Sequence, residues 1–136
     1  MIKLLIALSS TVLAVMSYAH HDISKDIDLE IYFELEGAIE TVEWINPHVI
    51  VHVNVEADNG LNQLWLIQAD SPNTLLRRGI NRNSLEFMSI IRFRVYPSSA
   101  NLCGTTCMGY GYEFTDSRGM TRVLHQSLHG IVNELK

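Results

Sequence analysis

The sequence is short of basic residues and of cysteine. Ten Lys and Arg residues stand against fifteen Asp and Glu residues, which gives a formal net charge of −5 at pH 7. A chain with this excess of acidic residues is not expected to have a basic surface that binds a polyanion, so nucleic acid is not an expected partner. Two cysteines among 136 residues exclude a small scaffold held together by many disulfides. The length fits a single domain with its own apolar core.

Local catalytic motifs are also missing. The sequence has no Ser-His-Asp order, no phosphate-binding glycine loop and no His-Glu-x-x-His pattern. Because the members of a catalytic triad need not be close in sequence, this argues only mildly against a hydrolase.

The first nineteen residues have the pattern of an export signal. Lys3 supplies a positive charge, residues 4–16 are mostly apolar, and Ser17-Tyr18-Ala19 provides small residues for cleavage. The apolar stretch of about 13 residues is shorter than the roughly 20 needed to span a bilayer. We therefore predict that residues 1–19 are a cleaved signal peptide and that no transmembrane anchor remains after cleavage. The mature protein, beginning at His20, is expected in the periplasm or outside the cell.

Apolar and polar residues alternate along most of the remaining chain, which is typical of half-buried strands. The alternation predicts strands over residues 31–44, 49–55, 63–68, 88–96, 110–114 and 120–125. Ser71 and Pro72 provide a helix start and Gly79 a stop, so a helix of about two turns is expected between the third and fourth strands. The first strand is long, and Gly37 offers a place for it to bend.

Three strands, a short helix and then further strands is the order of a five-stranded OB-type barrel. We therefore predict a mainly β fold, a small OB-like barrel of five to six strands that forms one domain over residues 20–125. Residues 126–136 are expected to be a C-terminal tail, either a short helix or a frayed end.

Six histidines in an acidic chain are the first candidates for chemistry, because neutral imidazole is a common ligand of zinc and copper. Cleavage before His20 would give that residue a free α-amine as well as a ring nitrogen. A third nitrogen from elsewhere would complete an arrangement that suits Cu(II), and His21 adds another nitrogen nearby. The alternative is that the two histidines are a polar start to a frayed terminus.

The other histidines differ in their suitability as partners of His20. Residues four apart in a strand are separated by about 13 Å, whereas a ligand must reach the metal at about 2 Å, so His48 and His52 cannot easily share one ion. His48 follows a proline at a turn and is preferred, although it could equally cap backbone groups. His52 lies among valines and is expected to be a hydrogen-bonded wall residue. His125 and His129 are expected to be solvated.

Cys103 and Cys107 lie four positions apart around a glycine. In an oxidising compartment the simplest expectation is a disulfide that pins the loop. The alternative is a soft site for Cu(I), formed by two thiolates with Met108 or Met120.

Arg77 and Arg78, with Arg82 nearby, form the only basic cluster of the sequence. Their guanidinium groups could contact an anion or a partner protein. Arginines at the end of a helix also complement its dipole, and we prefer this structural interpretation.

Three motifs resemble a known family. They are H-H at residues 20–21, W-I-N-P-H at residues 44–48, and S-P-N-T-L-L-R-R-G at residues 71–79. Together they are similar to small exported bacterial proteins that are catalogued only as a domain of unknown function. The resemblance covers residues 20–96 and implies an exported barrel, with no established activity.

The sequence supports two functional hypotheses. The first is a non-enzymatic exported barrel that binds a transition metal, with copper favoured, through His20 and His48 assisted by His21. The second is an accessory module that docks on another envelope protein or membrane complex through an exposed edge or an aromatic face, Trp44, Tyr110 and Tyr112. A copper-dependent redox enzyme ranks third, because nothing marks a substrate cleft.

Overall fold

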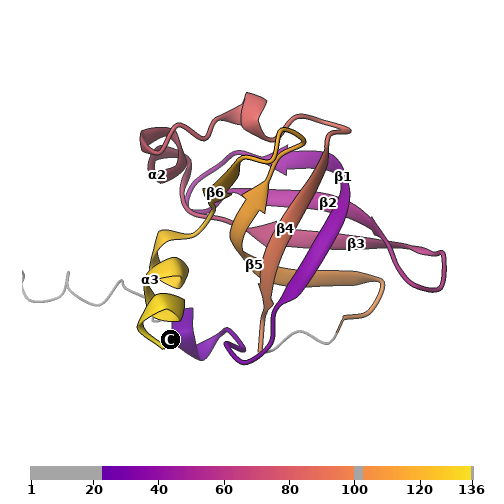
Figure 1. Ribbon diagram of the computed structural model, residues 1–136, viewed down its shortest axis with the longest axis horizontal. Helices are drawn as coiled ribbons and strands as arrows, with labels where there is room; N and C mark the ends of the chain where they lie inside the picture. Colours follow the sequence, from indigo (N-terminus) through magenta and orange to yellow (C-terminus); the bar gives the residue numbers. More distant parts are fainter. Residues whose placement is uncertain (1–22, 100–102, 136) are drawn as a thin grey trace, which may run out of the picture.

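The computed structural model describes residues 23–99 and 103–135, and its strands form one closed β-barrel (Figure 1). The elements, in chain order, are η2 (Ile23–Lys25), β1 (Phe33–Glu43), β2 (Ile50–Glu56), β3 (Asn62–Gln68), α2 (Pro72–Arg77), η3 (Arg82–Ser84), β4 (Ile90–Pro97), β5 (Thr106–Thr115), β6 (Thr121–Val123) and α3 (Gln126–Glu134).

The strands are arranged in the order β3-β2-β1-β4-β5-β6, and β3 also pairs with β5. This second pairing is parallel, with Leu64 opposite Thr106 and Gln68 opposite Tyr110, and it closes the first five strands into a barrel. The short strand β6 extends the sheet beyond β5. The predicted mainly β, OB-like barrel of five to six strands, with a short helix between strands 3 and 4, is confirmed.

Strand β1 takes part in both halves of the barrel. Its first half pairs with β4 and its second half with β2, and residues 37 and 38 pair with both. A Cβ at Gly37 would collide with the backbone oxygen of Asn54 and with Val53 Cγ1, at 2.8 Å, so the close approach of β2 requires glycine there. The predicted long strand is confirmed, but the irregularity lies beyond the glycine, between Ile39 and Thr41.

Local signals explain α2. The Ser71 hydroxyl accepts a hydrogen bond from the backbone N–H of Thr74 at 3.3 Å, and Pro72 occupies the first helical turn. Gly79 follows with a φ of 75°, the left-handed conformation that suits glycine after a helix. The helix predicted from these residues is therefore confirmed.

Some strand boundaries differ from the prediction. The fourth strand was expected from residue 88, but Met88 has a φ of 62°, which belongs to a turn, and β4 begins at Ile90. The fifth strand was expected from residue 110, but β5 begins at Thr106. Its first half pairs in parallel with β3, and the local alternation of the sequence does not carry that information.

The core has two parts. The barrel interior is filled by apolar side chains from every one of the first five strands, including Ile39, Val51, Ile67, Phe93 and Phe114. A second cluster lies between the barrel and α3 and comprises Ile27, Tyr96, Tyr112, Leu128 and Val132, with Ile23, Leu29 and Tyr110 packed against it. The C-terminal segment, for which a short helix and a frayed end were both open, thus forms a helix that buries one face (Figure 1).

Gly37→Ala should destabilise the protein by about 1–3 kcal/mol, because the added methyl group meets the backbone of β2 rather than a side chain that can move aside. Urea denaturation gives the free energy of unfolding. The control is Gly130→Ala in α3, where an added Cβ has open space around it, and that change should stabilise by about 0.5–1 kcal/mol. Equal stability of the two variants would contradict the close packing of β1 on β2.

Candidate functional site

Five polar or aromatic side chains meet at the corner of the barrel where α3 begins. We call them the histidine cluster: His48, Asp70, Arg78, Tyr110 and His125. They come from the residues just before β2, just after β3, the end of α2, the middle of β5 and the residue before α3. The fold therefore gathers them from distant parts of the chain.

Asp70 connects three of these segments. Its Oδ2 accepts a hydrogen bond from Arg78 Nη2 at 2.6 Å and another from the backbone N–H of Gln126 at 2.8 Å. Arg78 also donates through Nη1 to the backbone oxygen of Val123 at 3.0 Å. The side chains of Asp70 and Arg78 are only 13% and 23% exposed, so this ion pair is largely removed from water.

His125 is the most buried member of the histidine cluster, with 3% of its surface exposed. Its Nδ1 lies 3.5 Å from Asp70 Oδ1, but neither ring nitrogen makes a hydrogen bond to the described residues. The ring centroid is 6.4 Å from that of His48 and 6.3 Å from that of Tyr110. Nδ1 of His48 is likewise buried without a hydrogen-bond partner in the described part of the chain.

Buried ring nitrogens without a hydrogen-bond partner, as in His48 and His125, are uncommon, because leaving a buried polar atom unpaired costs free energy. Burial lowers the pKa of His125 below its ordinary value. The Asp70 carboxylate opposes this effect, while His48 and Arg78 add to it. At neutral pH the imidazole is therefore uncharged, and an uncharged imidazole is the form that can bind a metal ion.

The histidines considered in the sequence analysis lie in different environments. His48 lies half-buried in the histidine cluster, whereas His52 is on β2, where its Nε2 is 2.6 Å from Glu43 Oε1. The prediction of a hydrogen-bonded wall residue at His52 is confirmed. His20 and His21 lie outside the described residues.

The prediction that His125 is solvated is wrong. The residue follows the buried Leu124 and precedes α3, which buries Leu128 and Val132, and its ring lies near Asp70, His48 and Tyr110. A signal was present in the sequence, since apolar residues at positions 124, 128 and 132 have the spacing of one helix face. His129, on the same helix, stacks on Tyr112 with a centroid distance of 4.8 Å.

The two predicted arginines also have different environments. Arg78 points inward to Asp70, whereas Arg77 is exposed and donates to Thr74 Oγ1 at 3.3 Å. Nearby, the guanidinium of Arg82 lies over the ring of Trp44, 5.8 Å from its centroid. The three arginines thus do not converge on a common point.

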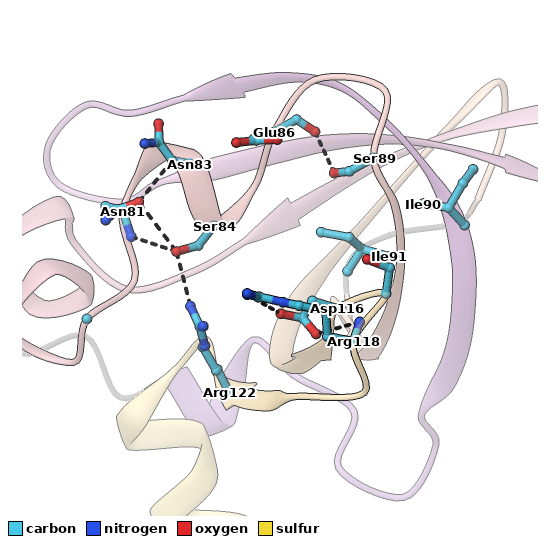
Figure 2. A pocket seen from close by; sticks show the side chains of 12 residues that line it. Asn81, Asn83, Ser84, Glu86, Ser89, Ile90, Ile91, Asp116, Arg118 and Arg122 are labelled. Atoms are coloured by element: carbon cyan, nitrogen blue, oxygen red, sulfur yellow. Dashed lines mark hydrogen bonds and ion pairs between the residues drawn. The ribbon is translucent and has the colours of Figure 1, made fainter.

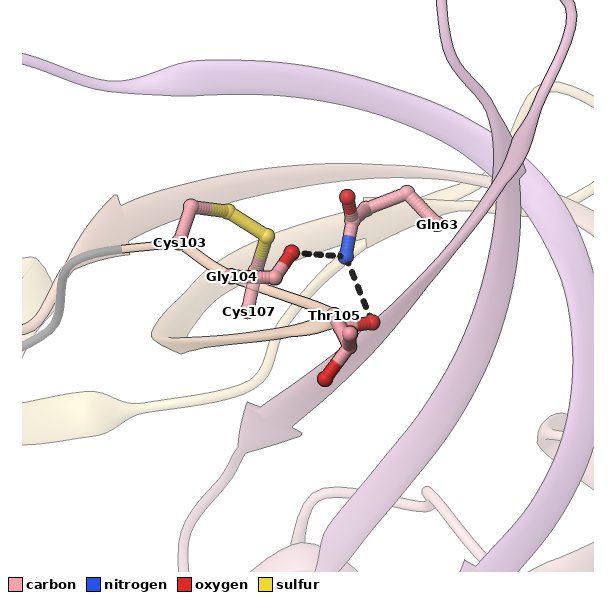
Figure 3. Close-up of a disulfide and its surroundings, with 5 residues drawn as sticks. All are labelled: Gln63, Cys103, Gly104, Thr105 and Cys107. Carbon is pink, nitrogen blue, oxygen red and sulfur yellow. Dashed lines mark hydrogen bonds between the residues drawn. A yellow bond between two sulfur atoms is a disulfide. The ribbon is translucent and has the colours of Figure 1, made fainter.

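Cys103 and Cys107 form a disulfide, as predicted (Figure 3). The amide of Gln63 on β3 donates to the backbone oxygens of Gly104 at 3.1 Å and Thr105 at 2.8 Å, and so ties the loop to the barrel. In this oxidised form the two sulfur atoms are bonded to each other and are not offered to Cu(I) as thiolates.

The aromatic face considered for docking does not form. Tyr112 is buried, with its ring packed against Tyr96 at a centroid distance of 5.8 Å. Trp44 packs against the barrel interior and Tyr110 against the cluster under α3. These three aromatic side chains were predicted to share an exposed surface, and the structure corrects that prediction.

A hollow of about 690 Å³ lies between η3 and the turn that connects β5 to β6 (Figure 2). Several of its polar groups are engaged with one another. Arg122 donates to Ser84 Oγ at 3.1 Å, and Arg118 pairs with Asp116 at 3.0 Å. Among the described residues that line the hollow, none has a buried side-chain nitrogen or oxygen without a hydrogen-bond partner.

Within residues 23–99 and 103–135, no group of three or more His, Cys, Asp and Glu side chains has a geometry that could hold a metal ion. No helix there is long and apolar enough to span a membrane.

The fold defines the class of this protein: a small closed β-barrel, covered at one corner by a C-terminal helix. The chain belongs to the family of unknown function DUF6152, whose model matches residues 7–106. The match includes His48, Asp70 and Arg78 and ends before α3 and His125. No curated protein and no solved structure matches the chain.

Arg78→Ala should lower the free energy of unfolding by about 2–3 kcal/mol, because it leaves the poorly exposed Asp70 carboxylate without its cation. Arg77→Ala is the matched control on the same helix turn and should change stability by less than about 0.5 kcal/mol. Chemical denaturation of both variants tests the difference. Similar losses from the two changes would contradict the assigned role of Arg78.

Acid should destabilise the protein through His125. Its pKa is lower in the folded protein than its ordinary value of 6.5, so the unfolded chain binds more protons as the pH falls through that value. In EDTA, the free energy of unfolding should therefore decrease as the pH falls below about 6.5. His125→Gln should flatten this slope, whereas the control His52→Gln should preserve it. An unchanged slope in His125→Gln would refute the assignment.

Proposed function

We propose that this chain is an exported β-barrel protein that binds a transition metal ion, with copper favoured, and acts as a binding protein rather than an enzyme. In this proposal His48 is the ligand from the barrel. The mature N-terminus contributes the amine and ring of His20, with His21 assisting. All of these donors are nitrogens, which suit Cu(II).

The observation that carries the proposal is the state of His48. Its Nδ1 is buried and has no hydrogen-bond partner among the described residues. A metal ion would give this lone pair a partner, and imidazole is a ligand suited to copper, zinc and nickel. The residue as a whole is half-buried rather than fully enclosed in the core.

The first described residues of the chain pack beside α3. Ile23 packs against the cluster that contains Leu128 and Tyr110, and η2 lies beside α3 in Figure 1. Tyr110 in turn touches His125 of the histidine cluster. The proposal requires that the three residues before Ile23, which can span up to about 10 Å when extended, bring His20 to this corner of the barrel.

The compartment is part of the proposal. The disulfide between Cys103 and Cys107 is typical of proteins that fold in an oxidising environment, such as the periplasm or the extracellular space. The N-terminal pattern of positive charge, apolar stretch and small residues agrees with export to such a compartment.

The mature protein should bind one Cu(II) ion with submicromolar affinity in isothermal titration calorimetry. His48→Gln, and separately one residue added before His20, should each weaken binding by at least roughly tenfold, because one removes a ligand and the other displaces the amine. His52→Gln is the control and should bind as the wild type does. Intact mass should give a chain that begins at His20. Micromolar or weaker binding that ignores both changes would overturn the proposal.

A further inference from the structure

We propose that His125 is a second ligand from the barrel, so that His48 and His125 form a two-imidazole site for a copper or zinc ion. The inference rests on the proposed function, because it shares His48 with that site. The inference adds His125, the residue before α3, which lies outside the segment that matches the family model.

Burial is the first argument. His125 is 97% buried, yet neither ring nitrogen has a hydrogen-bond partner in the described part of the chain, and the facing ring of His48 has a buried unpartnered nitrogen as well. A polar core residue that served only to fill space would be expected to satisfy at least one nitrogen. Two neighbouring imidazoles with free lone pairs are better explained by a ligand that both can bind.

The separation of the rings is the second argument. A ligating imidazole nitrogen lies about 2 Å from zinc, and similarly from copper, so two rings on opposite sides of one ion have centroids roughly 6 Å apart. The centroids of His48 and His125 are 6.4 Å apart, with 24° between the ring planes. The two rings are therefore close enough for one ion to lie between them.

Asp70 supplies the third argument. Metal-binding histidines usually donate their other ring N–H to a carboxylate or carbonyl, which fixes the ring. Asp70 Oδ1 lies 3.5 Å from Nδ1 of His125 and is positioned for this role, which would leave Nε2 for the metal. Its other oxygen is held by Arg78 and by the backbone of Gln126, so the carboxylate itself is fixed.

Two imidazoles do not fill the coordination sphere of Cu(II) or Zn(II). Further ligands of the bound ion would take the remaining positions. Since all the protein donors are nitrogens, the site should prefer copper and zinc to calcium or magnesium, which take oxygen ligands.

The first test compares Cu(II) binding of three mature proteins: the wild type, His125→Gln and the control His129→Gln. His129 lies on the same helix but bonds to Asn133 and stacks on Tyr112. We expect His125→Gln to weaken Cu(II) affinity by at least roughly tenfold and His129→Gln to leave it unchanged. Electron paramagnetic resonance should also show one nitrogen ligand fewer in His125→Gln. A folded His125→Gln protein with wild-type affinity and spectrum would overturn the inference.

The second test needs no variant and so does not depend on whether His125→Gln folds. Zn(II) is added to the wild-type protein, and the imidazole nitrogen resonances are followed by NMR. We expect the signals of both His48 and His125 to move, while those of His52 stay in place. A change at His48 alone would overturn the role of His125 and leave the proposed function standing. No change at either ring, together with no Cu(II) binding, would remove both.

Discussion

The carboxylate of Asp70 holds together three elements that are distant in sequence. It accepts hydrogen bonds from Arg78 at the end of α2 and from Gln126 at the start of α3. The backbone N–H of Asp70 also donates to the backbone oxygen of Leu124 at 2.9 Å. Because this carboxylate is mostly hidden from solvent, each partner offsets part of its desolvation. The place of His125, one residue before α3, depends on these contacts.

Closure of the barrel explains why these residues meet. The parallel pairing of β3 with β5 brings the end of β3 to the strand from which β6 and α3 continue. Asp70 lies two residues beyond β3, and His125 lies two residues beyond β6. Chain ends of paired strands come together at one corner, so polar residues that follow them can gather there without entering the barrel interior.

The parts of this architecture that depend on neighbouring residues could be predicted from the sequence. The capping by Ser71, the turn at Gly79 and the alternation along β1 to β3 are local signals, and the disulfide follows from a spacing of four. The early start of β5 and the burial of His125 depend on pairing with β3 and on the docking of α3, which join segments far apart in the chain. Of the histidine cluster, the sequence therefore predicted only His48 as a metal ligand, while Arg78 and Tyr110 were named for other roles and Asp70 and His125 were not recognised as members.

Strand β5 has a consequence for the order of assembly. It pairs with β4 on one side and with β3 on the other, so it covers two strand edges at once. Until residues 106–115 are in place, β1 to β4 form an open four-stranded sheet, and both of its edges present unpaired backbone groups. Open edges of this kind promote association between chains. The barrel thus depends on its penultimate strand for protection against aggregation, and a partly folded chain is most exposed to that risk before β5 pairs.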